Sequence, residues 1–178
     1  MKSLNVVILN GSLQQPSRTL ALCLALFEAM KAQRPDMVMH VVDIAQKGRA
    51  LGACLQRSEL PADIEADLQA VERADILIAA SPVYSASYTG LFKHFVDFMG
   101  MNVLAGKPVL LAATGGSPLH ALVIDQQLRP LFAMKQALTL PVGVYATEAD
   151  FTDYRINSAA LEKRIELAVQ LALPCLPM

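Results

Sequence analysis

The chain has 178 residues, of which 54% are hydrophobic and 17% are charged, and its formal net charge at pH 7 is −1. This length fits one domain with a sizeable core, so we expect residues 1–178 to form a single domain. The near-neutral balance, with scattered basic residues, argues against a nucleic-acid-binding surface. So little charge beside so many apolar residues favours a homo-oligomer in which part of the surface is covered.

The cysteines and the N-terminal run indicate the compartment. The apolar run that stops at Asn10 is too short for the apolar region of a signal peptide, and no uninterrupted span could cross a bilayer. Cys23, Cys54 and Cys175 are far apart and match neither a disulfide framework nor a zinc site. We therefore expect a cytoplasmic protein without membrane or metal contacts, in which Cys23 is a core residue.

Segments typical of strands and of helices alternate along the chain, with no linker or repeat. Short apolar and β-branched runs predict strands, and longer runs without Gly or Pro predict helices. Residues 45–61 are less regular and predict turns or a short helix. The predicted strands are 4–9, 37–42, 74–80, 108–113 and 141–145, and the predicted helices are 19–31, 61–72, 90–99, 119–139 and 158–173.

This alternation predicts an α/β fold, a doubly wound parallel sheet of five strands with helices on both faces. Right-handed crossovers bring the loops that follow the strands to one edge, at the carboxyl ends of the strands. The loops 10–18, 81–89 and 114–118 all fall on that edge. We therefore expect these loops to build one site together.

The first loop joins a strand to a helix through Gly11-Ser12 and Ser17-Arg18-Thr19. A helix start offers unpaired N–H groups and the positive end of the helix dipole. The hydroxyls of Ser12, Ser17 and Thr19 add donors, and Arg18 adds a positive charge. The stretch has neither a P-loop nor a dinucleotide fingerprint. It predicts a phosphate site, and the alternative is an ordinary turn with Ser17 as N-cap.

The other two loops suit a flat ligand. Residues 81–90 combine small residues with Tyr84 and Tyr88, which provide an aromatic wall or an oligomer contact. The alternative is a solvent loop that one tyrosine anchors to the core. Residues 114–117, Thr-Gly-Gly-Ser, present N–H groups without bulky side chains, which suits the carbonyl edge of a heteroaromatic ring. A phosphate cradle, an aromatic wall and a glycine rim together predict a flavin mononucleotide (FMN) site.

These motifs occur in the order and spacing of a known family. On them, and over residues 3 to 155, the chain resembles the NAD(P)H-dependent FMN reductases, in particular those of two-component alkanesulfonate and methanesulfonate monooxygenase systems. The resemblance implies a flavodoxin-like fold with strand order 2-1-3-4-5, FMN at the carboxyl edge, and a homodimer or homotetramer. The motifs are Gly11-Ser12, Ser17-Arg18-Thr19, Ser81-Pro82-Val83-Tyr84, Tyr88-x-Gly90-x-x-Lys93-x-x-x-Asp97 and Thr114-Gly115-Gly116-Ser117.

The resemblance also implies roles for single residues. Lys93 and Asp97 match the family pattern but lie inside a predicted helix, so we assign them to structure or to a subunit interface. The cofactor-binding residues are Gly11, Ser12, Ser17, Arg18 and Thr19 at the phosphate, Pro82, Val83, Tyr84 and Ser85 along the isoalloxazine, and Thr114, Gly115, Gly116 and Ser117 at its rim.

One position departs from the family. Gln126 stands where the sulfonate-type reductases tend to carry Tyr or His, in a π-helical bulge associated with the tetramer interface and with flavin exchange. Pro130 has no N–H to bond the Gln126 carbonyl, which favours a local widening of the helix. The helix also has more apolar residues than one buried face needs, which predicts contact with a partner subunit. These residues are Leu122, Val123, Leu128, Leu131, Phe132 and Met134.

The chemistry that a flavin implies needs few side chains. Hydride passes from nicotinamide C4 to flavin N5 without a side-chain acid or base, so we predict no catalytic residue. His120 is interpreted as a capping or packing residue, and His40 and His94 as structural or surface residues. The sequence lacks an arginine patch for a 2′-phosphate, so NADH and NADPH both stay open.

Three functions compete. The first is an FMN reductase whose reduced flavin reaches a partner monooxygenase. The second is a quinone, azo-dye or metal-ion reductase that retains its FMN. The third is a flavodoxin-like electron carrier, which the nearly neutral charge disfavours because such carriers usually present an acidic face. The sulfonate-type resemblance favours the first.

Overall fold

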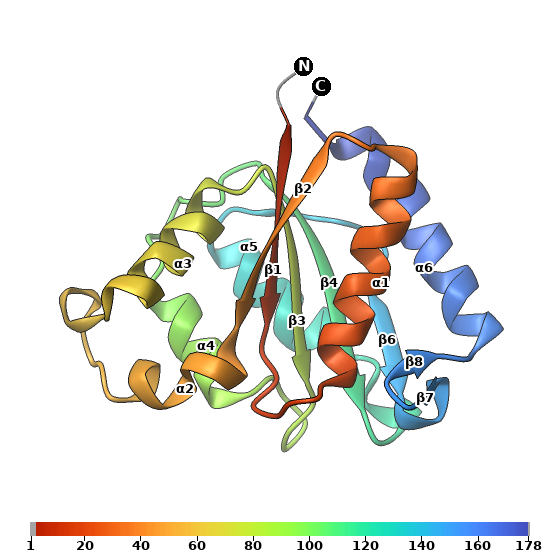
Figure 1. Ribbon diagram of the computed structural model, residues 1–178, viewed down its shortest axis with the longest axis horizontal. Coiled ribbons are helices and arrows are strands. Elements are labelled where there is room, and N and C mark those ends of the chain that lie inside the picture. The colour runs from red at the N-terminus through yellow and green to blue at the C-terminus, as the bar shows by residue number, and fades with distance from the viewer. Residues whose placement is uncertain (1–2, 178) are drawn as a thin grey trace.

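A parallel sheet forms the centre of the computed structural model, which describes residues 3–177 (Figure 1). The strand order is β2-β1-β3-β4, and β5 and β6 both pair with β4, so these two short strands share the fifth position. This order confirms the predicted flavodoxin-like arrangement. The strands are β1 (Leu4–Asn10), β2 (Met37–Asp43), β3 (Ile76–Pro82), β4 (Pro108–Gly115), β5 (Leu138–Thr139) and β6 (Val144–Thr147).

Helices cover both faces of this sheet. Helices α1 and α6 lie on one face, and α2, α3, α4 and α5 contribute to the other (Figure 1). Among residues 3–177, no helix is both long and apolar enough to span a membrane. The helices are α1 (Arg18–Gln33), α2 (Ile44–Gly52), α3 (Ala62–Arg73), α4 (Gly90–Asp97), α5 (Arg129–Met134) and α6 (Ala159–Ala172).

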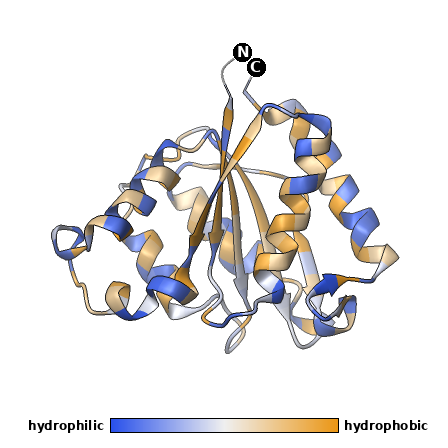
Figure 2. Cartoon of the chain, viewed as in Figure 1, coloured by the Kyte–Doolittle hydropathy of each residue, from blue (hydrophilic) through white to orange (hydrophobic). Residues whose placement is uncertain are grey.

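Alternating side chains of the strands divide the core in two. Ile8 of β1 packs on the side of α1 and α6, whereas its neighbour Leu9 packs on the side of α3 and α4. Figure 2 shows the result, apolar central strands between helices that mix polar and apolar residues. Cys23 is fully buried in the first cluster, as predicted, and this burial raises the pKa of its thiol to about 12.

The predicted helix over 119–139 is wrong in extent. The segment begins with a 3₁₀ turn (Pro118–His120), continues as a π-helical turn (Ile124–Leu128), and ends with α5 at Met134. The π turn confirms the widening expected from Pro130.

The helix stops because Gln136 adopts a left-handed conformation with φ of 61°. Its N–H donates to the carbonyl of Ala133 at 2.9 Å, and the N–H of Ala137 donates to that of Phe132 at 3.1 Å. This is a Schellman cap, which glycine usually provides. Because no glycine marks the position, the end of the helix could not be predicted from the sequence.

The fifth strand also differs from its prediction over 141–145. Leu138 and Thr139 pair with the start of β4, and pairing resumes only at Val144. Pro141 lies in the gap, where a residue without an N–H cannot donate to the ladder. The predicted strand is therefore displaced and split.

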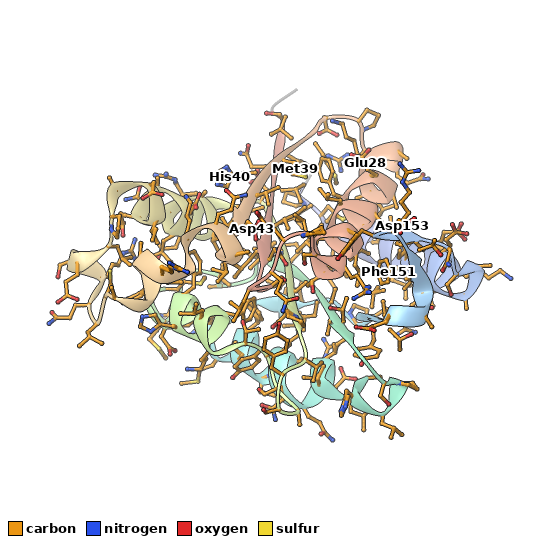
Figure 3. All side chains as sticks on the ribbon, turned by 60° about the horizontal axis from the view of Figure 1, so that its bottom comes forward. Glu28, Met39, His40, Asp43, Phe151 and Asp153 are labelled. Atoms are coloured by element: carbon orange, nitrogen blue, oxygen red, sulfur yellow. The ribbon has the colours of Figure 1, made fainter. Side chains whose placement is uncertain are left out.

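An antiparallel hairpin after β6 was not predicted. It consists of β7 (Phe151–Thr152) and β8 (Arg155–Ile156). Asp153 and Tyr154 form its turn with φ values of 47° and 62°, the left-handed pair typical of a tight hairpin. Figure 3 labels Phe151 and Asp153 in this hairpin, with the lower edge of Figure 1 turned toward the viewer.

Two histidines make the structural contacts that we expected. His40 Nε2 lies 2.8 Å from Asp67 Oδ1, and the buried Asp67 carboxylate also binds the ammonium of Lys47. His94 Nε2 lies 2.8 Å from the carbonyl oxygen of Cys54. Both rings therefore hold neighbouring elements together on the surface of the fold.

Candidate functional site

The register of the sheet brings the three predicted loops to the same level. Asn10 pairs with both Asp43 and Ala80, and Ser81 pairs with Ala113. A cavity of about 260 Å³ lies where these strands end. It is lined by Ser12, Gln14, Pro16, Ser17, Arg18, Thr19, Pro82, Val83, Tyr84, Thr114, Gly115, Gly116, Glu148 and Tyr154.

A buried carboxylate holds the first loop. Asp43 is only 5% exposed, and its oxygens accept hydrogen bonds from the side-chain amides of Asn10 at 2.9 Å and Gln15 at 2.6 Å. The N–H of Ala45 and the side chain of Gln46 also donate to it, at 3.2 and 3.3 Å. Sequence reasoning missed Asp43, although its place at the end of a strand on this edge could have singled it out (Figure 3).

The start of α1 retains free donors. Ser17 is the N-cap, as the alternative interpretation expected, and its Oγ accepts the N–H of Leu20 at 3.1 Å. The N–H groups of Arg18 and Thr19 have no partner within the helix because they lie in its first turn. The first turn contains no acidic residue. This helix start can therefore be capped by Ser17 and still present N–H groups to an anion.

Three threonine hydroxyls connect the loops. Thr19 Oγ1 lies 2.7 Å from Thr114 Oγ1, which joins α1 to the third loop. Thr89 Oγ1 donates to the carbonyl of Gly11 at 2.8 Å, and the N–H of Thr89 donates to Ser81 Oγ at 3.0 Å. All these side chains are buried, so the three loops form one hydrogen-bonded unit.

The second loop turns tightly at its tip. Tyr84 and Ser87 exchange backbone hydrogen bonds of 2.8 and 3.0 Å across Ser85 and Ala86, whose φ values of 49° and 63° are left-handed. The exposed Tyr84 lines the cavity, whereas Tyr88 packs on the core with its ring 5.9 Å from that of Phe92. One tyrosine thus lies in the wall and the other anchors the loop.

The third loop is fixed by a tyrosine from the neighbouring strand. Tyr145 Oη donates to the carbonyl of Ser117 at 2.6 Å, and burial raises the pKa of this phenol. A Cβ at Gly115 would collide with that hydroxyl, whereas a Cβ at Gly116 would meet nothing within 4 Å. Gly115 therefore allows the close packing, and Gly116 leaves open space beside the cavity.

Gly11, Ser85 and Ser117 are the predicted cofactor-binding residues that lie outside the cavity lining. Gly11 packs behind the first loop, where an added Cβ would lie 2.6 Å from Phe92 Cδ2. Ser85 occupies the exposed tip of its turn, and Ser117 caps the following 3₁₀ turn by accepting the N–H of Leu119 at 3.2 Å.

Other residues that the sequence singled out lie outside this lining too. His120 is exposed at the end of its 3₁₀ turn. Lys93 and Asp97 form an exposed ion pair along α4, with Nζ 2.6 Å from Oδ1, which fits their structural assignment.

Glu148 and Tyr154 complete the cavity and were missed. Arg18 Nη1 lies 3.2 Å from Glu148 Oε1, and the Arg18 guanidinium carbon lies 5.6 Å from the centre of the Tyr154 ring. Both residues follow β6, the last strand of the sheet. Applying the carboxyl-edge rule to that strand as well would have indicated this segment.

The model of the NADPH-dependent FMN reductase family matches residues 4–152. The chain belongs to this family. Among relatives of this FMN reductase, an NADH-dependent FMN reductase, SfnF, from Pseudomonas fluorescens is 55% identical over 97% of this chain and 92% of its own length. An FMN reductase (NADPH) from Pseudomonas aeruginosa is 51% identical over 95% of this chain and 90% of its own length.

A solved structure agrees with this assignment. The apo form of an NADH:FMN oxidoreductase, EMOB, superposes with a TM-score of 0.85 at 28% identity, covering 98% of this FMN reductase and 91% of that chain. The family resemblance and the fold inferred from the sequence are both confirmed.

The role of Asp43 can be tested by replacing it with asparagine. In Asp43→Asn an amide nitrogen takes the place of one carboxylate oxygen and faces the donors of Gln15 and Gln46. We expect the free energy of unfolding to fall by about 1–3 kcal/mol because donors lose their acceptor. FMN affinity should fall as well, because the first loop is no longer held. Urea denaturation and an FMN fluorescence titration measure the two effects.

Asp97→Asn is the matched control, because the same change is made in an exposed surface pair. We expect its unfolding free energy to stay within about 0.5 kcal/mol of wild type. If Asp43→Asn behaved like Asp97→Asn in both measurements, the first loop would not depend on Asp43.

Proposed function

We propose that this FMN reductase binds FMN at the carboxyl edge of its sheet, with the phosphate at the start of α1. The observation that carries the proposal is the donor set there. Free N–H groups, the hydroxyls of Ser17 and Thr19, and the guanidinium of Arg18 converge on one cavity. Ser12 lines it too, and its hydroxyl would have to turn from the carbonyl of Gln14, to which it donates at 3.1 Å, to reach the phosphate. Such a set fits a phosphate monoester, which has several acceptor oxygens and a double negative charge.

The proposed ring site lies between the second and third loops. Pro82, Val83 and Tyr84 offer apolar and aromatic surface, with Ser85 at the tip of the same turn. Thr114, Gly115 and Gly116 offer a rim without bulky side chains, and Ser117 follows them directly in the chain. The open space at Gly116 supports this assignment, because a flat ring needs close access to the backbone.

Bound FMN supplies the redox chemistry, the acceptance of a hydride from a nicotinamide. The protein positions the two rings and needs no acid or base, so we assign no catalytic residue. Arg18 is the one cationic side chain among the described lining residues, and the flavin phosphate would occupy it. The described lining has no second cation that would select for the 2′-phosphate of NADPH, so the site would accept either NADH or NADPH.

We further propose that the reduced flavin leaves the enzyme and supplies a flavin-dependent monooxygenase, in line with the sulfonate-type resemblance. The three free cysteines, Cys23, Cys54 and Cys175, fit the reducing cytoplasm in which this chemistry would take place. A reductase that retains its FMN and passes electrons to a quinone, an azo dye or a metal ion is the alternative.

Dialysis separates these two alternatives. We expect the dialysed protein to be colourless and to oxidise NADH or NADPH only when free FMN is added, with saturation in FMN. Under anaerobic conditions the reduced flavin should then pass through an ultrafiltration membrane. A yellow protein whose activity does not depend on added FMN would instead support the retained-FMN alternative.

The phosphate site can be tested through the difference between FMN and riboflavin, which lacks the phosphate. Arg18→Ala should weaken FMN binding about 10- to 100-fold, because a charge-assisted hydrogen bond is lost. Riboflavin binding should change by less than about twofold, the effect expected of a surface change. Fluorescence titration measures both. Equal losses for the two ligands would remove Arg18 from the phosphate site.

We also propose that the enzyme is a homodimer or homotetramer. Not all of the apolar side chains predicted to contact a partner over 119–139 are available for that contact. Val123, Leu128 and Phe132 are buried in the core, whereas others stay exposed. The exposed ones lie in the 3₁₀ turn, between this turn and the π turn, and in α5, which supports an interface there. Leu119, Leu122 and Met134 are 86, 59 and 63% exposed.

Light scattering tests this interface. At micromolar concentration we expect the mass of a dimer or tetramer, and we expect Leu122→Glu to lower it because a charge would be buried between subunits. Leu55→Glu is the control, because Leu55 is 83% exposed and belongs to the loop after α2 instead of this segment. A wild-type monomer, or equal masses for both variants, would contradict the proposal.

A further inference from the structure

A negative side chain lies in the cavity that the proposed function assigns to an anion. Among the described residues of the lining, Arg18 and Glu148 are the charged ones, and they contact each other with Nη1 3.2 Å from Oε1. The flavin phosphate would need the same guanidinium. Glu148 is therefore a rival acceptor for the one cation that the phosphate can use.

We propose that Glu148 sets the affinity for FMN by competing with the phosphate for Arg18, and so shortens the time that the flavin stays bound. The inference rests on the proposed function. The side chains of Arg18 and Glu148 are 40% and 66% exposed. An ion pair this exposed is weak, so it can be opened by a ligand and tunes affinity without blocking the site.

The backbone beneath Glu148 is fixed. Glu148 begins the 3₁₀ turn (Glu148–Asp150) directly after β6, and Asp150 Oδ2 accepts the N–H and the hydroxyl of Thr147 at 2.7 and 2.9 Å. The Asp150 carboxylate is thus committed to the turn. The Glu148 carboxylate has no such partner in the turn and reaches across the cavity to Arg18.

The guanidinium of Arg18 has a second support. Tyr154, at the tip of the β7–β8 hairpin, places its ring 5.6 Å from the guanidinium carbon, within the range of a cation–π contact. Removing the charge of Glu148 therefore leaves Arg18 held beside the cavity. Its N–H groups then become available to a phosphate.

The test compares Glu148→Gln with wild type by fluorescence titration of FMN and of riboflavin. We expect FMN to bind about two- to fivefold more tightly, the range that a weak exposed ion pair allows. FMN dissociation in stopped flow should slow by a similar factor, and riboflavin affinity should not change. A structural role of Glu148 alone would not separate the two flavins.

Glu166→Gln is the matched control, since it removes the same charge. Glu166 lies on α6 beside Ala29 and Gln33, near the end of α1 that is remote from Arg18. We expect its affinity for FMN to equal that of wild type. If Glu166→Gln gained as much as Glu148→Gln, the effect would be one of net charge and the competition would be refuted.

Further outcomes would overturn the proposal. Unchanged or weaker FMN binding in Glu148→Gln would do so, as would an equal gain for riboflavin. A full gain in the Arg18→Ala background would show that Glu148 does not act through Arg18. Wild-type protein that binds no FMN would refute the proposed function itself, whereas normal wild-type binding with any of the other results refutes only the competition.

Discussion

The parallel register of β1 between β2 and β3 is the constraint on which the site depends. It sets Asn10 beside Asp43 on one side and Ala80 on the other. β1 and β2 end at this level and β3 ends two residues farther on, so side-chain hydrogen bonds can span the gaps between the loops. A shift by one residue would turn Asn10 toward the opposite face of the sheet and separate its amide from the Asp43 carboxylate. The loops would then lose their common anchor.

The architecture could be predicted because the core repeats a simple pattern. Apolar strands alternate with helices, and β1, β3 and β4 end within two residues of their predicted ends. The sheet order came from the family resemblance, since alternation alone does not distinguish one doubly wound order from another. What failed were the places where the chain reverses without glycine. Gln136 and the turn at Asp153 adopt left-handed conformations that these residue types disfavour, so the sequence does not indicate them.

The residues of the candidate site also fall into those that the sequence indicated and those that it did not. Loop residues such as Ser17, Arg18 and Thr114 could be found because each follows a predicted strand or begins a predicted helix. The carboxyl-edge rule could have indicated the segments that hold Asp43, Glu148 and Tyr154, but not their contacts, which exist only after folding. Arg18 and Glu148 are 130 positions apart, and no spacing rule links two charges so far apart in the chain. Such pairs require a three-dimensional structure, even when both elements are correctly predicted.

The ends of the described chain lie far from the candidate site. Leu4 and Leu176 belong to the same core cluster, and the start of β1 and the end of the helical segment after α6 lie at the top of Figure 1, opposite the loops. A linker attached at either end would therefore emerge on the side opposite the cavity. The enzyme could be immobilised on a surface, or joined to a second protein, with the mouth of its cavity still facing solution.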